Sequence, residues 1–105
     1  IVIIEDIQGI KNLDEIMTVE NIDVFFVAPN DLAQSMGLAN SKSKDKLNKE
    51  IHQAIQKIQK ANKKVGTLAN STNIDSYIDL GVDLLLYDTN QFIRDGITDL
   101  KNKIK

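Results

Sequence analysis

The stretch from Asp23 to Gly37 constrains the fold of this chain more than any other part of its sequence. It opens with the apolar run Val24–Val27, and a short continuous apolar run is typical of a buried strand in a parallel sheet. Pro29 has no backbone N–H to donate to a sheet ladder, so we expect the strand to end just before it. Asp31 then lies beyond the carboxyl end of a strand, where parallel α/β folds place their functional residues.

Segments typical of strands and of helices alternate along the whole chain. Short β-branched or apolar runs predict strands, and apolar residues at helical spacing predict helices. The expected strands are Ile1–Ile4, Val24–Val27, Lys64–Ala69 and Val82–Tyr87. The expected helices are Gly9–Met17, Asp31–Met36, Lys44–Asn62, Ile74–Leu80 and Gln91–Lys105. This alternation predicts a parallel sheet with right-handed crossovers.

Two details of the helices follow from side-chain chemistry. Ser71 or Thr72 is a suitable N-cap for the helix that contains Tyr77, because either hydroxyl can accept a backbone N–H. The apolar positions of the last helix recur at helical spacing, so we expect five side chains to face the core: Phe92, Ile93, Ile97, Leu100 and Ile104.

About four βα units are expected, in one domain that covers residues 1–105. A closed (β/α)₈ barrel usually needs about 250 residues. The expected fold is therefore α/β, half of a (β/α)₈ TIM barrel with a parallel sheet. The alternative is a small open flavodoxin-like sheet, in which strands and helices also alternate.

Half a barrel has two open edge strands, here Ile1–Ile4 and Val82–Tyr87. Exposed edges of this kind template pairing with another chain, and cyclic dimers are the commonest oligomers. We therefore expect a homodimer or a larger homo-oligomer. Its formation would also cover the inner face of the sheet, where we expect Ile3, Phe25 or Phe26, and Leu85.

Composition excludes several classes of function. The formal net charge of -2 gives no electrostatic argument for a nucleic-acid partner. The absence of cysteine excludes disulfides, thiolate catalysis and zinc–thiolate sites. No apolar run approaches the roughly 20 residues of a membrane span, and no signal peptide is visible. We expect a cytoplasmic protein with neither nucleic-acid nor membrane partners.

Polar residues follow the expected strands at Glu5, Asp31, Asn70 and Asp88. Neighbouring strands lie about 4.8 Å apart, so Glu5 and Asp31, which follow consecutive strands, can lean into one space. Two carboxylates, water and a substrate oxygen suit a hard divalent cation such as Mg²⁺ or Mn²⁺. The alternative is that both acids are solvated loop residues or helix N-caps.

The sequence pattern assigns no catalytic nucleophile or base. His52 is the only histidine, and it lies on the polar stripe of the long helix, which favours a surface residue over a ligand or base. No lysine follows an expected strand, no serine lies in a G-x-S-x-G elbow, and no phosphate-binding glycine motif is present. The catalytic residues therefore stay unassigned.

Several short motifs occur in a fixed order along the chain. They are Ile4-Glu5-Asp6, Leu13-Asp14-Glu15-Ile16, Asp23–Val27, Ala28-Pro29-Asn30-Asp31-Leu32-Ala33-Gln34-Ser35-Met36-Gly37, Gly81-Val82-Asp83 and Tyr87-Asp88. In this order they resemble the C-terminal half of the HpcH/HpaI aldolase family. Members of that family are class II, divalent-metal-dependent pyruvate aldolases.

The resemblance implies cleavage or formation of 4-hydroxy-2-oxo acids, with pyruvate and an aldehyde as the partners. It implies that Glu5 and Asp31 ligate Mg²⁺ or Mn²⁺, with Co²⁺ as a further candidate. It also implies that backbone N–H groups of Asn30 and Asp31 hold the carboxylate of a 2-oxo acid such as pyruvate. The ion would polarise that acid and stabilise its enolate.

The sequence departs from the family pattern at several positions. Ile3 replaces a frequent Gln, Asp6 replaces Thr, and Ala28 replaces Gly. The Arg and the His base of the family lie in the first half of the barrel, and neither His52 nor Arg94 stands at those positions. We therefore expect little or no aldolase turnover from this chain alone. A non-catalytic, self-associating half-barrel and a small α/β binding module are the alternative functions.

Overall fold

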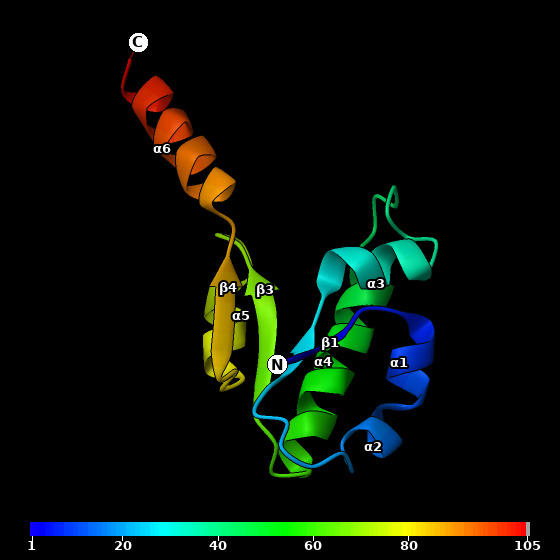
Figure 1. Ribbon diagram of the computed structural model, residues 1–105. Coiled ribbons are helices and arrows are strands. Elements are labelled where there is room, and N and C mark those ends of the chain that lie inside the picture. The colour runs from blue at the N-terminus through cyan, green and yellow to red at the C-terminus, as the bar shows by residue number, and fades with distance from the viewer. Residues whose placement is uncertain (105) are drawn as a thin grey trace.

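The computed structural model describes residues 1–104 and shows a single parallel sheet with helices (Figure 1). The sheet order is β1-β2-β3-β4, so each strand pairs with the next one along the chain. The strands are β1 (Val2–Ile4), β2 (Phe25–Val27), β3 (Val65–Ala69) and β4 (Leu84–Tyr87). The helices are α1 (Ile7–Lys11), α2 (Leu13–Ile16), α3 (Pro29–Ser35), α4 (Asp45–Lys60), α5 (Ile74–Asp79) and α6 (Thr89–Lys103).

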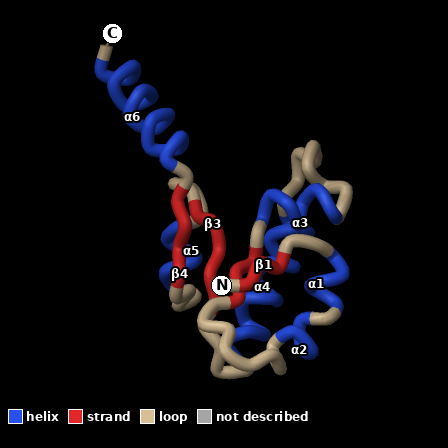
Figure 2. Tube along the Cα trace, viewed as in Figure 1, coloured by secondary structure: helices blue, strands red, loops and turns tan. Residues whose placement is uncertain are grey.

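The strand order decides between the two expected folds. Every crossover moves the chain one strand further in the same direction. Helices α4 and α5 lie behind the strands in the view of Figure 2, and among the described residues no helix lies in front of them. A flavodoxin-like sheet has the order 2-1-3-4-5 and helices on both faces, so the open-sheet alternative is wrong. The prediction of four parallel βα units is confirmed.

The hydrophobic core lies between the helices and the sheet face that they cover. The register aligns Ile4, Val27 and Thr67 across the sheet, and the last two are fully buried. The Thr67 hydroxyl donates a hydrogen bond of 2.9 Å to the Val27 carbonyl, so its polar group is satisfied. Helix α4 packs its apolar stripe on this face and buries Leu47, Ile51, Ala54, Ile55 and Ile58.

The opposite face of the sheet is uncovered in the part of the chain that the structure describes. Ile3 and Leu86 are 58% and 50% exposed there. Phe26 shares this face but is buried, because its ring crosses Gly66, where a Cβ would lie 2.8 Å from Phe26 Cδ2. The prediction that Leu85 lies on this open face is wrong. Side chains alternate along a strand, so Leu86 is on the open face and Leu85 packs against the core.

The helix expected over Gly9–Met17 is in fact two short helices, α1 and α2. Asn12 separates them, with φ -95° and ψ 11°. Helix α1 begins earlier than expected because Asp6 is its N-cap and accepts the Gly9 N–H at 2.6 Å.

The predicted N-cap of α5, Ser71 or Thr72, is wrong, because the N-cap is Asn73. The Asn70 side-chain oxygen accepts the N–H groups of Thr72 and Asn73 at 2.9 and 3.2 Å. These bonds form a turn of the kind that Asn favours. The helix therefore starts only after this turn.

The inward orientation predicted for the last helix is also wrong. Helix α6 extends away from the sheet (Figure 1), and the longest dimension of the molecule is 56 Å. Its apolar side chains are 49% to 69% exposed: Phe92, Ile93, Ile97, Leu100 and Ile104. The helix continues past the end of β4 instead of returning along the sheet, so within residues 1–104 this stripe remains exposed, although the ring of Phe92 contacts that of Tyr87. Lys105, the last residue of the predicted helix, lies outside the described residues.

Among the described helices, none combines the length and the apolar character that crossing a bilayer requires.

Candidate metal centre

The carboxyl ends of β1 and β2 open into one cavity of about 180 Å³. Glu5 follows β1, Asp31 lies in the first turn of α3, and both line this cavity. The open sheet face supplies an apolar wall that includes Ile3, Phe26 and Leu86. The structure thus brings the two predicted acids to one space, while their role as metal ligands stays a prediction.

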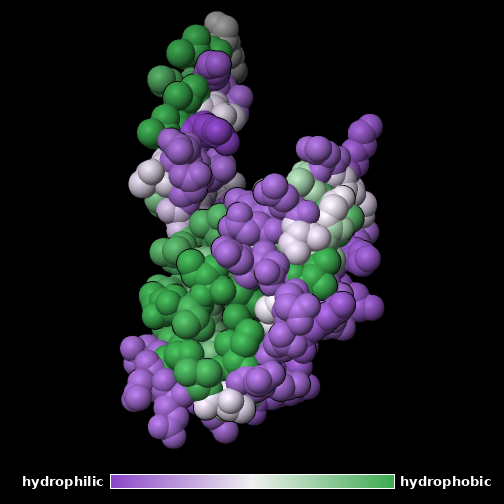
Figure 3. Space-filling view, turned by 45° about the vertical axis from the view of Figure 1, so that its right-hand side comes forward, coloured by the Kyte–Doolittle hydropathy of each residue, from purple (hydrophilic) through white to green (hydrophobic). Residues whose placement is uncertain are grey.

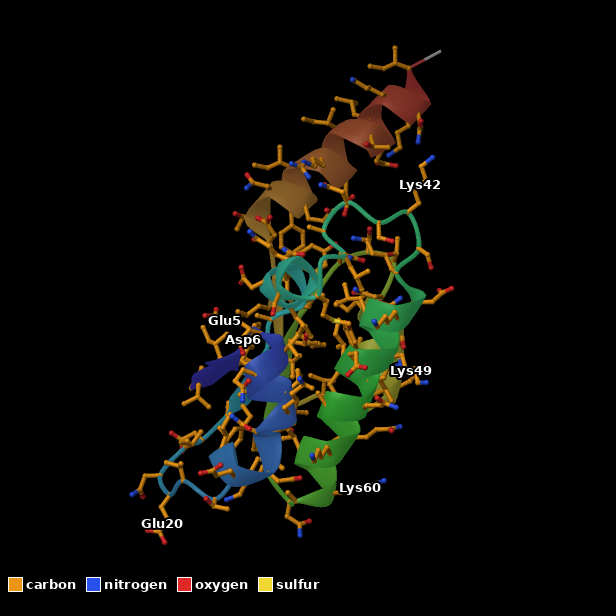
Figure 4. The ribbon with its side chains drawn as sticks, turned by 90° about the vertical axis from the view of Figure 1, so that its right-hand side faces the viewer. Glu5, Asp6, Glu20, Lys42, Lys49 and Lys60 are labelled. Carbon is orange, nitrogen blue, oxygen red and sulfur yellow. The ribbon has the colours of Figure 1, made fainter. Side chains whose placement is uncertain are left out.

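The segment that carries Glu5 is held by the start of α1. Figure 4 shows Glu5 and Asp6 side by side where β1 ends and α1 begins. Asp6, which replaces the Thr of the family pattern, accepts the Gly9 N–H at 2.6 Å. A Cβ at Gly9 would lie 3.2 Å from both Asp6 Oδ1 and Ile4 Cγ2, so the turn leaves little room for a side chain there. Asp6 therefore has a capping role.

The loop from β2 into α3 places backbone N–H groups at the same cavity. Ala28 is the N-cap of α3, with φ -94° and ψ 102°, and it contributes no side-chain hydrogen bond. Pro29 occupies the first helical turn and has no N–H. The N–H groups of Asn30 and Asp31 therefore lie at the positive end of the helix. Their proposed contact with a substrate carboxylate stays a prediction.

The chemistry of the donor set fits a hard divalent cation. No three His, Cys, Asp or Glu side chains converge on one point within residues 1–104. The two carboxylates that line the cavity are those of Glu5 and Asp31. Mg²⁺ is commonly bound through one or two carboxylates, with several waters and substrate oxygens completing the octahedron. Mn²⁺ has a similar preference for oxygen ligands.

A second cavity of about 250 Å³ adjoins the first, since Pro29 and Asn30 line both. Its other polar lining residues follow β3 and β4, precede α5 or lie in the first turns of α6: Asn70, Asn73, Asp88, Gln91 and Arg94. Sequence reasoning missed Gln91 and Arg94. The available signal was their spacing of three residues on a helix that begins beside a strand end, which places both on one helix face.

Two other polar residues considered from the sequence, Asp88 and His52, make contacts that stabilise the fold. The Asp88 side chain accepts the Asn90 N–H at 2.9 Å and caps α6. His52 is half-buried on α4, rather than fully solvated, and its ring meets that of Tyr77 edge-on at a centroid distance of 6.1 Å. His52 lines neither cavity at the strand ends.

Residues 1–93 match the family model described as HpcH/HpaI aldolase/citrate lyase. The chain is 32% identical over 92 residues to 2-keto-3-deoxy-L-rhamnonate aldolase of Escherichia coli O6:K15:H31 (strain 536 / UPEC), covering 80% of this chain and 34% of that protein. It is 38% identical over 79 residues to 4-hydroxy-2-oxo-heptane-1,7-dioate aldolase of Shigella sonnei (strain Ss046), covering 74% and 30%. The chain therefore spans about a third of the length of the curated relatives it matches.

A solved structure shows the same fold. The HpcH/HpaI aldolase/citrate lyase family protein from Burkholderia cenocepacia J2315 matches with a TM-score of 0.85 at 18% identity, over 98% of this chain and 41% of that one. At this identity the likeness concerns the fold alone. Four sequential βα units that reproduce about two-fifths of such a protein form half of a (β/α)₈ barrel, as predicted.

Proposed function

The chain belongs to the HpcH/HpaI aldolase/citrate lyase family, and we propose that it is the metal-binding, C-terminal half of a cytoplasmic, divalent-metal-dependent aldolase. The proposed reaction is the cleavage or formation of 4-hydroxy-2-oxo acids, with pyruvate and an aldehyde as partners. One observation carries the proposal: Glu5 and Asp31 line one cavity at the carboxyl ends of adjacent parallel strands. The two relatives named above are both aldolases by name.

In this proposal each group at the cavity has a separate role. The carboxylates of Glu5 and Asp31 hold Mg²⁺, Mn²⁺ or Co²⁺. The backbone N–H groups of Asn30 and Asp31 orient the carboxylate of the 2-oxo acid. The bound ion supplies Lewis acidity to the 2-oxo group. The apolar wall from the open sheet face excludes water once a partner covers it, which strengthens the electrostatic interactions inside.

We propose that the isolated chain is inactive as an aldolase. Within the described residues, no His, Lys or Tyr lines the cavity that contains Glu5 and Asp31. Acid–base catalysis by a positioned side chain typically contributes 10²–10⁴-fold, and that contribution must come from elsewhere. An assay of pyruvate release from a 4-hydroxy-2-oxo acid should therefore show no turnover above background.

Titration with Mn²⁺ tests the metal site directly. We expect weak binding by wild type, because only two protein ligands are available, and no measurable binding by Asp31→Ala. Asp45→Ala is the matched control, since Asp45 is also an acid in the first turn of a helix but does not line the cavity. Calorimetry measures all three proteins. Binding that is unchanged in Asp31→Ala would refute the assignment.

We further propose that the chain self-associates as a homodimer or a larger homo-oligomer. A hydrophobic patch covers the sheet side of the molecule, and hydrophobic residues line one side of α6 (Figure 3). Strands β1 and β4 are edge strands, each paired on one side only within the described chain. A stable interface buries about 1,200 Å² or more. The alternative occupant of the open sheet face is the complementary half of a barrel.

A further inference from the structure

We propose that Ser35 positions the two carboxylates of the candidate metal centre relative to each other. The inference rests on the proposed function, because it takes Glu5 and Asp31 as the metal ligands. Its basis is a hydrogen bond of 3.0 Å in which the Ile7 N–H donates to Ser35 Oγ. This bond joins residues that are 28 positions apart in the sequence.

The start of α1 needs this bond for a general reason. The first N–H groups of a helix have no partner within the helix. The Asp6 side chain satisfies the N–H of Gly9, in the third position of α1. The N–H of Ile7, the first residue of α1, is satisfied by Ser35 instead. A side chain of α3 thereby completes the capping of α1.

The bond joins the two segments that carry the proposed ligands. Ile7 lies two residues after Glu5, at the point where the chain turns from β1 into α1. Ser35 lies four residues after Asp31, which places both on the same face of α3. A displacement of α3 relative to the Glu5 segment would therefore break the Ile7–Ser35 hydrogen bond.

A second hydrogen bond also joins the two segments that carry the acids. The two hydrogen bonds and the chain segments between them form a closed ring, here called the frame. The Ala28 N–H donates to the Ile4 carbonyl at 2.9 Å, which ties the end of β2 to the end of β1. Glu5 lies between Ile4 and Ile7 on one side of the frame. On the other side, Asp31 lies between Ala28 and the serine. Each ligand is thus held from a strand end and from a helix.

Ser35 is a positioning residue, because it does not line the cavity that contains the two acids. Its hydroxyl is exposed, so its loss should have little effect on overall folding. Removing a hydrogen-bond partner that orients a metal ligand typically costs 10–100-fold in metal affinity. The serine acts through the backbone next to the ligand, so we expect the lower end of that range, about tenfold.

Three variants of the chain separate positioning from general stability. Ser35→Ala removes the acceptor, and Ser35→Thr keeps a hydroxyl at the same position. Ser41→Ala is the matched control, since the Ser41 hydroxyl also makes a backbone hydrogen bond, to the Ser43 carbonyl at 2.8 Å, within a surface loop. Mn²⁺ affinity is measured by electron paramagnetic resonance of the free ion, at a temperature where circular dichroism shows every variant folded. Amide exchange of Ile7, measured by NMR without metal, reports the hydrogen bond itself.

The expected result is about tenfold weaker Mn²⁺ binding and faster Ile7 exchange in Ser35→Ala alone. Wild-type affinity in Ser35→Ala would overturn the role of Ser35 while leaving the metal site intact. An equal loss of affinity in Ser41→Ala would also overturn it, because the effect would then be general. A wild-type chain that binds no Mn²⁺ would overturn the proposed function and the role of Ser35 with it.

Discussion

Helices α4 and α6 are both amphipathic, but α4 packs against the sheet and α6 extends away from it. They contain 16 and 15 residues, both have apolar residues at helical spacing, and both have lysines in the last turn. Helix α4 buries five side chains, whereas α6 buries none within the described residues. The difference arises because α4 lies between two paired strands and crosses their shared face, whereas α6 follows the last strand. An amphipathic pattern shows that a face requires burial, but not which surface will bury it.

The two helices also differ in how well they can stand alone. Gly96 lies in the interior of α6, and no described residue outside this helix comes within 4 Å of where its Cβ would be. Glycine costs a helix interior about 1 kcal/mol relative to alanine. Isolated helices shorter than about 12–15 residues are marginal in water, and α6, with 15 residues, is close to that limit. Helix α4 contains no glycine. Helix α6 therefore depends on a partner more strongly than α4 does, which supports the proposed self-association.

Within residues 1–104, the contacts between α6 and the end of β4 involve the first turns of the helix. The rings of Tyr87 and Phe92 lie 4.4 Å apart between centroids. The Tyr87 hydroxyl donates to Asp95 Oδ2 at 3.2 Å, and Gln91 Nε2 donates to the other carboxylate oxygen at 2.8 Å. These contacts set the direction in which the helix leaves the sheet.

The largest expected effect comes from truncating a buried residue of α4. Ile55 is fully buried, so Ile55→Ala should lower the free energy of unfolding by about 2–5 kcal/mol. The same truncation in α6, Ile97→Ala, should change it by less than about 0.5 kcal/mol, because Ile97 is 49% exposed. Urea denaturation at low protein concentration measures both. Equal losses would mean that α6 is packed in the monomer.

A smaller effect is expected from placing a charge on the apolar stripe of α6. If a second copy covers this stripe, Ile97→Asp removes about 1.5–3 kcal/mol of apolar burial, which weakens self-association roughly tenfold to a hundredfold. Asn102→Asp adds the same charge away from the stripe and should leave assembly unchanged. Light scattering after size exclusion gives the mass of each protein. A wild-type chain that is a folded monomer at micromolar concentration contradicts self-association.

The smallest expected effect concerns the anchor of α6. Burial, followed by the hydrogen bond and the charge of Asp95, raises the pKa of Tyr87. Asp95→Asn removes a negative charge that disfavours the tyrosinate, so the pKa of Tyr87 should fall. Ultraviolet titration follows it, with Tyr77 as an internal control, because burial raises the pKa of that residue without help from Asp95. No change at Tyr87 would show that the first turns of α6 are not held against β4.

The sequence predicted the order of the elements well because its signals there are local. An apolar run followed by Pro29 marks the end of β2, and the same logic places Glu5 and Asp31 at adjacent strand ends. The errors at the helix starts have local causes too, but they depend on competing hydrogen bonds. The Asn70 side chain forms a turn before α5, and Asp6 starts α1 early. Several residues near each helix start can cap it, and the sequence does not rank them.

The sequence by itself determined four βα units, their parallel pairing and two carboxylates at neighbouring strand ends, because periodicity, chain breakers and crossover handedness act over short distances. Tertiary structure alone decided which strand residues face the helices, as at Leu85 and Leu86, and whether an amphipathic helix finds a surface. It also decided that Ser35 caps α1 across 28 residues. Such contacts depend on the relative placement of distant segments, since the burial that fixes them is a property of the surfaces that meet.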